Sequence, residues 1–354
     1  MFDLVFVGFG NVARRAAALL AELGPALPFT ARTVAIVTAR HGAASAVNGL
    51  ELRAAIARIE SGGVFDTWSG SLPPPALPGQ SNAPALAALA ERHATAARDG
   101  RLVCIETTLL DIEAGEPAIS HVRAALTGGA HVVTANKGPV AFAYADLAAL
   151  ARQCRREFLF EGAVMDGIPV FNLVRETLPG VRIERFRGVI NSTTNHILTR
   201  LEQGETFGTA LAQMQADGIA EADPALDVDG WDAAAKTAAL MNVLMDARVT
   251  PHDIEREGIR RVTTEHMRTA ARAGMRLRLV ASAHRRNGAA SGRVRLERVS
   301  LRDPLGGLEG QQNALLLGTD LLGEIGVVQR DGGLTQTAYA IVSDLATIAR
   351  RRPS

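Results

Sequence analysis

The sequence predicts an α/β protein in which a doubly wound parallel sheet is followed by a second domain of α+β order. In the first 150 residues, short apolar runs alternate with alanine-rich amphipathic stretches. Strands that are apolar throughout, separated by helices, are typical of a parallel sheet covered on both faces. After about residue 150 this alternation stops, and two longer strand-like runs flank a block of helical periods. The change of pattern indicates a second domain.

The N-terminal elements follow in order. DLVFVGFG (residues 3–10) and TVAIVTA (33–39) predict buried strands on either side of a helix over 11–23. Segment 69–84 contains five prolines and predicts a loop, because proline cannot donate a backbone hydrogen bond. Beyond this loop the pattern predicts helices over 85–99 and 116–129 and strands over 102–107 and 131–135.

In the second half, residues 183–191 and 290–301 predict strands. Helical periods occupy 194–204, 207–218 and 231–245, and the tail over 337–351 predicts a last helix. Strands and helices that do not alternate favour an α+β domain.

Composition restricts the class of protein. The 354 residues suffice for about two domains. With 38 Lys and Arg against 37 Asp and Glu, the net charge is +1, which gives no electrostatic reason to expect nucleic acid or a membrane as partner. The N-terminus lacks the features of a signal peptide or a membrane helix. Cys104 lies in an apolar run and is expected to be a buried thiol, so we expect a cytoplasmic protein.

A glycine loop follows the first strand and opens the first helix. Gly8, Phe9, Gly10, Asn11 and Val12, with an alanine after them, give the form G-x-G-x-x-A. The first glycine permits a tight turn, and the second lets the backbone approach a pyrophosphate at the helix N-terminus. The loop therefore predicts a dinucleotide site in a Rossmann-type domain, and an ordinary strand-to-helix turn is the alternative.

Arg40 stands near the end of the second strand, where an acidic residue would hold the ribose 2′-hydroxyl of NAD. An arginine there favours the 2′-phosphate of NADP. The alternatives are that Arg40 faces solvent, or that nearby Arg32 or Arg53 fills the role. We expect NADP as cofactor, with NAD as the alternative.

Five carboxylates and a lysine crowd the stretch EADPALDVDGWDAAAK, from Glu221 to Lys236. A calcium loop with Gly230 at its sixth position would have alanine at position 1 and Lys236 at position 12, which excludes an EF-hand. Asp232 and Lys236 are spaced i, i+4 on a helix that is otherwise apolar, so they should point into an interior or a cleft. A lysine held between burial and carboxylates can move a proton. The residues alone leave a catalytic pair and a structural ion pair equally open.

GIAEADPALDVDGWDAAAK resembles the signature of the homoserine dehydrogenase family. Further segments that resemble this family are EPAISHVRAALTGGAHVVTANKGPV, EGAVMDGIPV, GVINSTTNHIL, the glycine loop and the tail DGGLTQTAYAIVSDL, which together cover nearly the whole chain. Because the chain starts at the glycine loop and stops soon after the last motif, we expect a short form without a regulatory or kinase domain.

The resemblance implies reversible, NAD(P)-dependent reduction of L-aspartate 4-semialdehyde to L-homoserine, a step towards threonine, methionine and isoleucine. By this resemblance Lys236 is the acid/base group and Asp227 orients it. Glu221 and Asp232 would bind the substrate, and Lys137 would lie near substrate and nicotinamide. Alternatives are another amino-acid dehydrogenase of the same plan, or a silent cofactor-binding sensor. The intact lysines and carboxylates argue against the sensor.

The same resemblance implies the remaining sites. Thr108, Gly218 and Gly333 would contact the cofactor, although the tail departs from the family's tighter glycine run. A sodium ion would be held by Glu161, Val164, Asp166 and Ile168, since hard cations take oxygen ligands. Residues 1–150, completed by 325–354, would form the dinucleotide-binding domain. Residues 151–324 would form a substrate-binding domain that also makes a homodimer.

Overall fold

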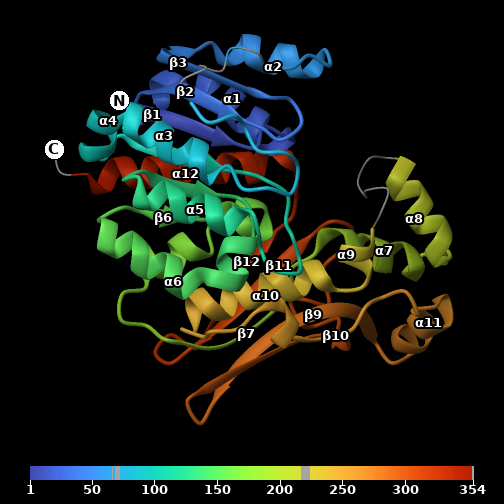
Figure 1. Cartoon of the computed structure of the whole chain (residues 1–354). Helices are drawn as coiled ribbons and strands as arrows, with labels where there is room; N and C mark the ends of the chain where they lie inside the picture. The colour runs from blue at the N-terminus through green and yellow to red at the C-terminus, as the bar shows by residue number, and fades with distance from the viewer. Residues whose placement is uncertain (66, 68–71, 217–223, 353–354) are drawn as a thin grey trace. The chain divides into compact units, whose positions relative to one another are not determined.

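The computed structural model describes residues 1–65, 67, 72–216 and 224–352. The chain divides into two compact units (Figure 1). The first unit comprises Met1–Pro169 together with the segment that begins at Gly333, and the second comprises Val170–Gly332.

The first unit is built on a six-stranded sheet with the order β3-β2-β1-β4-β5-β6. Its strands are β1 (Phe2–Val7), β2 (Ala31–Val37), β3 (Ala43–Leu50), β4 (Leu102–Glu106), β5 (His131–Thr134) and β6 (Phe158–Leu159). All neighbours pair in parallel except β3, which runs antiparallel to β2. Chain order reverses between β1 and β4, the point at which sheets of this kind bind their ligands. The predicted doubly wound parallel sheet is therefore confirmed, with one antiparallel edge strand added.

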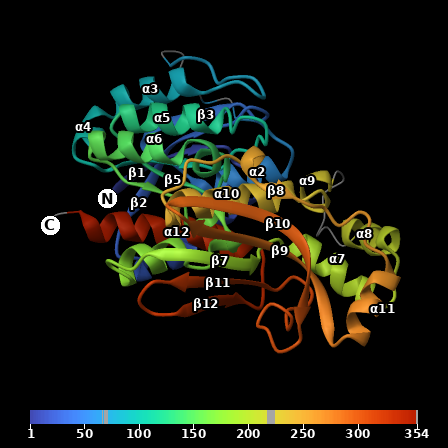
Figure 2. The same ribbon diagram turned by 90° about the horizontal axis from the view of Figure 1, so that it is seen from below.

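Helices cover both faces of this sheet. They are α1 (Asn11–Leu23), α2 (Leu52–Glu60), α3 (Ala83–Arg92), α4 (Ala94–Arg98), α5 (Ala118–Thr127), α6 (Gly138–Cys154) and α12 (Leu334–Arg351). Figure 2 shows α3, α5 and α6 on one side of β1 and β5, with α12 on the other. The predicted helix over 85–99 is broken at His93 into α3 and α4.

The C-terminal helix α12 packs on α1 and shares its core. Phe6 and Ala13 lie in one buried cluster with Ile341 and Leu345. Residue 150, the expected end of the first domain, falls inside α6, and the units divide instead between Pro169 and Val170. The difference arises because β6 pairs with β5 and so extends the first sheet beyond residue 150.

The second unit is an antiparallel sheet with helices packed on it. Its strand order is β12-β11-β7-β9-β10-β8, and only β8 pairs in parallel among the described strands of this sheet. The strands are β7 (Ile183–Val189), β8 (Glu255–Arg256), β9 (Met275–Arg286), β10 (Ala289–Ser300), β11 (Asn313–Thr319) and β12 (Glu324–Gln329). The helices are α7 (Ser192–Glu202), α8 (Phe207–Ala216), α9 (Ala225–Val228), α10 (Trp231–Leu244) and α11 (Thr264–Arg272). The predicted α+β order is confirmed.

Helix α10 is buried on most sides, as its alanine-rich sequence predicts, and packs on β9 and β10. A Cβ atom on Gly292 of β10 would come within 2.4 Å of the Met241 sulfur, so a side chain at residue 292 would require Met241 to move. Over the described ranges, no helix is long and apolar enough to cross a membrane.

Candidate active site

The glycine loop has the geometry that a pyrophosphate requires. Gly8 has φ +83°, and a Cβ there would lie 2.9 Å from the backbone of Thr107. A Cβ on Gly10, by contrast, would meet no heavy atom within 4 Å among the described residues. Open space beside Gly10 at the start of α1, where no described side chain caps the helix, fits an anion held by backbone N–H groups. A dinucleotide therefore fits this loop.

The other loop residues contribute differently. The Phe9 side chain is buried and packs edge-on against Phe6 and Phe65, so only its backbone can face a ligand. Asn11 is exposed, and its Oδ1 accepts a hydrogen bond from Arg14 at 2.7 Å. Val12 packs partly buried against the core of the first unit.

Arg40 lies in the exposed turn after β2. The turn is closed by Thr38, whose hydroxyl donates to the Gly42 carbonyl at 2.8 Å and accepts from the His41 N–H at 2.8 Å. Within the described part of the chain, no hydrogen bond or ion pair holds the Arg40 guanidinium. Arg32 lies at the opposite end of β2 and is bound to Asp3 through two hydrogen bonds of 2.6 and 3.2 Å. Arg32 is therefore excluded as the 2′-phosphate ligand.

The loops after β4 and β5 are tied together. Asn136 donates from Nδ2 to the carbonyls of Thr108 and Leu109, at 3.0 and 3.2 Å, and accepts from the Gly138 N–H at 2.8 Å. Lys137 is half-buried at the start of α6. Gly8 touches the Thr107–Thr108 backbone, so three of the predicted cofactor positions lie at one edge of the sheet.

The segment expected to bind sodium forms two tight turns after β6. Glu161 is 2% exposed, and its N–H donates to Oδ2 of Asp344 at 2.9 Å. Three successive residues, from Met165 through Asp166 to Gly167, have positive φ values of 52°, 49° and 80°. Val164 is buried, while Asp166 and Ile168 are half-buried. Among the residues described, no three His, Cys, Asp or Glu side chains are grouped as a metal site, so any ion here would depend on backbone carbonyls.

Gly333 is the residue before α12 and has an extended backbone. Gly218 and Glu221 lie outside the described residues.

In the second unit, the predicted site carboxylates Asp227 and Asp232 both bind Asn191. From Nδ2, Asn191 donates to Asp227 Oδ1 at 2.7 Å and to Asp232 Oδ2 at 2.8 Å. The Lys236 ammonium lies 3.0 Å from Asp232 Oδ2 and donates to the Ile190 carbonyl at 2.8 Å. The structure thus brings together Asp227, Asp232 and Lys236.

This cluster is shielded from solvent. The side chains of Asp232 and Lys236 are each 12% exposed, and Asn191 is 4% exposed. The expectation that Asp232 and Lys236 point away from bulk solvent is therefore confirmed. Two carboxylates thus lie in one cluster with an ammonium group. Such a site suits a ligand that carries a positive charge.

Asp229, in the same acidic run, has a structural role. It is half exposed and bonded to Arg260, whose guanidinium lowers the pKa of the Asp229 carboxyl. Arg256 donates to the Asp229 carbonyl at 2.7 Å and stacks 3.5 Å above the Trp231 ring. Gly230 has φ +81°, and a Cβ there would meet the Glu257 carbonyl at 2.5 Å. These contacts fix the turn from which α10 starts.

Two central residues, Asn191 and Glu106, were not predicted from the sequence. Asn191 is the last residue of the predicted strand over 183–191 and lies just beyond the end of β7. Its side chain also accepts from the Thr194 N–H at 2.8 Å as the N-cap of α7. A cap residue after a strand is a signal for the helix start, but not for the bridge between Asp227 and Asp232. Glu106 ends β4 and is 0% exposed.

Comparison with known proteins agrees with this geometry. A family model described as homoserine dehydrogenase matches residues 169–346. An NAD(+)-dependent homoserine dehydrogenase of Pseudomonas canavaninivorans is 35% identical over 98% of this chain and 96% of its own length. A homoserine dehydrogenase of Methanocaldococcus jannaschii is 34% identical over 98% of both chains. A solved hyperthermophilic archaeal homoserine dehydrogenase in complex with NADPH superposes with a TM-score of 0.79 at 28% identity, over 100% of this chain and 99% of that one. The chain therefore belongs to the homoserine dehydrogenase family of NAD(P)-dependent oxidoreductases.

Proposed function

We propose that this protein interconverts L-aspartate 4-semialdehyde and L-homoserine, with Lys236 as the acid/base group. The observation that carries the proposal is the cluster in which Asn191 bridges Asp227 and Asp232 while Lys236 lies between Asp232 and the Ile190 carbonyl. In the cell this reaction would serve the formation of threonine, methionine and isoleucine.

We assign a separate role in the reaction to each residue of the cluster. When bound, the nicotinamide cofactor supplies the hydride for reduction or accepts it in the reverse direction. Lys236 gives its proton to the aldehyde oxygen during reduction and recovers it from the hydroxyl during oxidation. Asp232 and the Ile190 carbonyl hold the ammonium in place. We assign to Asp227 the role of orienting the lysine through Asn191, which binds both carboxylates.

Substrate binding is assigned to carboxylates. The amino group of the substrate is cationic, and carboxylate groups attract it. We assign this contact to Glu221 and Asp232, and we assign to Lys137 a second cationic contact near the substrate and the nicotinamide.

The test is steady-state turnover of L-homoserine by the purified protein with NADP and with NAD. We expect reduction of the cofactor that requires homoserine, and its reoxidation with L-aspartate 4-semialdehyde. Cofactor binding without turnover of either compound would refute the proposal. A different amino-acid dehydrogenase is the second candidate, and it is distinguished by preferred turnover of another aldehyde or keto acid.

For the cofactor, we propose a preference for NADP through Arg40. The support is that Arg40 is exposed after β2, while Arg32 is bound to Asp3. One relative is named as NAD(+)-dependent, and one solved relative binds NADPH, so the family accommodates both. We assign the pyrophosphate to the residues of the glycine loop, and further cofactor contacts to Thr108, Lys137, Gly218 and Gly333.

A sodium ion in the turns after β6 is part of the proposal. Positive φ values cost free energy in residues with side chains and persist where packing or a ligand compensates. Here α12 supplies packing, since a Cβ on Gly167 would meet Ala340 and the Gln336 carbonyl at 2.6 Å. Glu161, Val164, Asp166 and Ile168 would offer carbonyl oxygens, and the carboxylates of Glu161 and Asp166 would offset the charge.

We further propose a cytoplasmic homodimer that associates through the second unit. Large apolar side chains are exposed there: Leu301, Leu321, Leu322 and Val328 are 52–70% exposed. Exposed apolar groups of this kind favour a protein partner. Light scattering should return about twice the 37.4 kDa of one chain. Cys104 and Cys154 are unbridged thiols, which suits a reducing compartment.

A further inference from the structure

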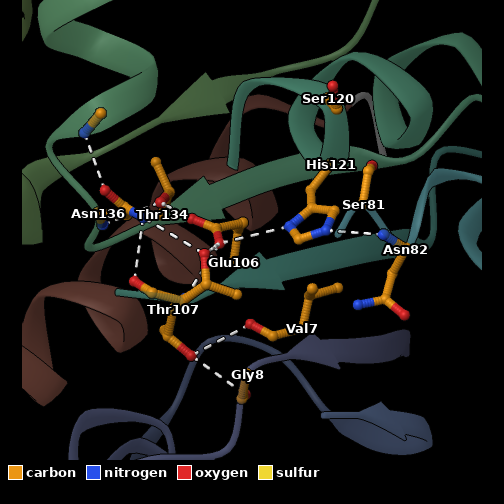
Figure 3. A network of polar contacts seen from close by, with 12 residues as sticks. Val7, Gly8, Ser81, Asn82, Glu106, Thr107, Ser120, His121, Thr134 and Asn136 are labelled. Carbon is orange, nitrogen blue, oxygen red and sulfur yellow. Dashed lines mark hydrogen bonds and ion pairs between the residues drawn. The ribbon is translucent and has the colours of Figure 1, made fainter. Parts of the chain in front are cut away.

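Glu106 is a buried carboxylate at the ligand-binding edge of the parallel sheet. It is the last residue of β4 and pairs in register with Val7, the last residue of β1. Its exposure is 0%. A buried carboxylate at this place is costly unless several donors surround it. Figure 3 shows what surrounds it.

The first set of donors belongs to Thr108. The Thr108 N–H donates to Glu106 Oε1 at 3.0 Å, and the Thr108 hydroxyl donates to the same oxygen. Both of the donors that Thr108 possesses are therefore engaged. A ligand can use only the remaining lone pairs of the Thr108 oxygens, so Glu106 makes Thr108 an acceptor towards the ligand.

The second set leads to the loop after β5. Thr134 donates from its hydroxyl to Glu106 Oε2 at 2.9 Å and accepts from the Asn136 N–H at 3.0 Å. Asn136 in turn binds the Thr108 carbonyl and the Gly138 N–H. The two oxygens of Glu106 thus hold both loops, with Lys137 between Asn136 and Gly138. Thr107 extends the network to the glycine loop through a hydrogen bond of 3.1 Å to the Gly8 carbonyl.

His121 completes the surroundings of Glu106 and connects it to the end of the proline-rich segment. His121 Nε2 accepts from the Asn82 N–H at 2.9 Å, so the remaining proton of the neutral ring is on Nδ1. Nδ1 has no hydrogen-bond partner in the described ranges and lies 3.7 Å from Glu106 Oε1. Asn82 also accepts from the Ala76 N–H at 2.8 Å. The segment before α3 therefore fixes which ring nitrogen faces the carboxylate.

We propose that Glu106 is a positioning residue for the nicotinamide end of the cofactor, acting through Thr108 and through the Asn136–Lys137 loop. An acceptor oxygen on Thr108 suits the carboxamide NH₂ group of nicotinamide, which is a donor. This inference rests on the proposed cofactor contacts of Thr108 and Lys137. It makes no use of the substrate cluster in the second unit.

The test compares binding of the whole cofactor with binding of a fragment that lacks nicotinamide. Affinities for NADP and for 2′-phospho-ADP-ribose are measured by calorimetry on the wild type and on Glu106→Gln. Replacing a charged acceptor by a neutral one should weaken NADP roughly fivefold to tenfold. Affinity for the fragment should stay within about twofold, because its contacts belong to the glycine loop and Arg40.

Asp3→Asn is the matched control. Asp3 is a buried carboxylate of the same sheet, also 3.7 Å from a histidine Nδ1, but at the opposite edge. This variant should lower thermal stability and change neither affinity. Thr108→Val, which keeps the shape and removes the hydroxyl, should reproduce the selective loss of NADP affinity even if Glu106→Gln folds poorly.

Two outcomes would overturn the proposal: equal weakening of NADP and of the fragment, which indicates general damage, or no weakening of NADP in either variant. The result stays distinct from the test of the proposed reaction. Wild-type protein that binds NADP without oxidising homoserine would refute the reaction and still allow the role of Glu106 to be measured.

Discussion

The two edges of the parallel sheet use the same kinds of residue for different ends. At the amino edge, Asp3 binds Arg32 at 2.6 Å and lies 3.7 Å from His93 Nδ1. At the carboxyl edge, Glu106 lies 3.7 Å from His121 Nδ1, and Arg40 extends from the turn after β2. The charged groups at the amino edge bind one another, whereas the groups at the carboxyl edge hold the loops around a predicted ligand site.

The surroundings of the histidine at the amino edge show the difference. Burial, the largest cause, lowers the pKa of His93, so at neutral pH its contact with Asp3 is not an ion pair. Asp3 is neutralised by Arg32 instead, whose pKa the bond to Asp3 raises. A carboxylate matched by an arginine stabilises a fold. A carboxylate that accepts hydrogen bonds from hydroxyl and N–H donors fixes the positions of those donors.

The largest expected effect tests whether cofactor affinity depends only on residues at the carboxyl edge of the parallel sheet. Lys236→Ala, in the second unit, should lower kcat by about 10²–10⁴-fold, the usual contribution of general acid catalysis. The dissociation constant of NADP should stay within about twofold. The rate and the dissociation constant are measured separately. A lower rate with unchanged NADP binding would support the separation of the cofactor site from the second unit. Joint loss of rate and binding would break it, because the cofactor site would then depend on the second unit.

Lys236→Arg is the control for proton transfer. Arginine keeps the positive charge beside Asp232 but does not release a proton near neutral pH. We expect it to remain nearly inactive. Recovery of more than about a tenth of the wild-type rate would show that charge alone is required and would remove the acid/base role.

Local patterns predicted the parts of the site that depend on short spacings. The glycine loop lies within six residues of sequence, and Asp232 and Lys236 are one helical turn apart. The central residues Glu106 and Asn191 were not predictable in this way, because their hydrogen-bond partners are distant in the chain. Thr134 is 28 residues from Glu106, and Asn191 is 36 and 41 residues from the two carboxylates it bridges.

Strand β3 was missed for a related reason. Its sequence AASAVNGL is small and weakly apolar, with none of the continuous apolar character of β1 or β4. It becomes a strand by pairing antiparallel with β2 at the edge of the sheet. Pairing with a neighbour, rather than its own propensity, determines the structure of such a segment.

The next effect compares Arg32, at the start of β2, with Arg40, in the turn after it. Arg40→Ala should weaken NADP by about 1.5–3 kcal/mol, roughly tenfold to 150-fold, and leave NAD nearly unchanged, because only NADP carries the 2′-phosphate. Titration of each variant with both cofactors measures this. Equal losses for NADP and NAD, or none, would show that Arg40 faces solvent.

Arg32→Ala is the matched change at the other edge. It leaves Asp3, whose side chain is 2% exposed, without its guanidinium partner, and should lower the free energy of unfolding by about 1–3 kcal/mol. Neither cofactor should bind more weakly to the folded protein. A selective loss of NADP affinity in this variant would reverse the assignment of the two edges.

The smallest effect concerns the stability of the fold at acidic pH, which should depend on residues at the amino edge of the parallel sheet. His131 begins β5, with Nδ1 accepting from the Glu157 N–H at 2.9 Å and Nε2 donating to the Gly100 carbonyl at 3.1 Å. The bond that Nδ1 accepts requires the neutral ring, because a protonated Nδ1 has no lone pair to accept it. Burial, followed by the charge of Arg156, lowers the pKa of His131 to about 4.

The sign of the pH dependence follows from this lowered pKa. As pH falls below about 6.5, His131 binds a proton in the unfolded chain but stays neutral in the folded chain. The contribution of His131 to the free energy of unfolding is therefore complete above pH 6.5 and is lost progressively down to about pH 4. At pH 5 the loss is on the order of 2 kcal/mol. His93, whose pKa burial also lowers, acts in the same direction.

Urea unfolding at pH 7.5 and pH 5 of the wild type and of His131→Asn measures the effect. The variant should be less stable at pH 7.5, because it loses the fit of the ring between Gly100 and Glu157. It should also lose about 2 kcal/mol less than the wild type on acidification, because asparagine does not titrate. If both proteins lose the same amount, the proton taken up on unfolding binds elsewhere, and acid sensitivity no longer distinguishes the amino edge of the sheet from the carboxyl edge.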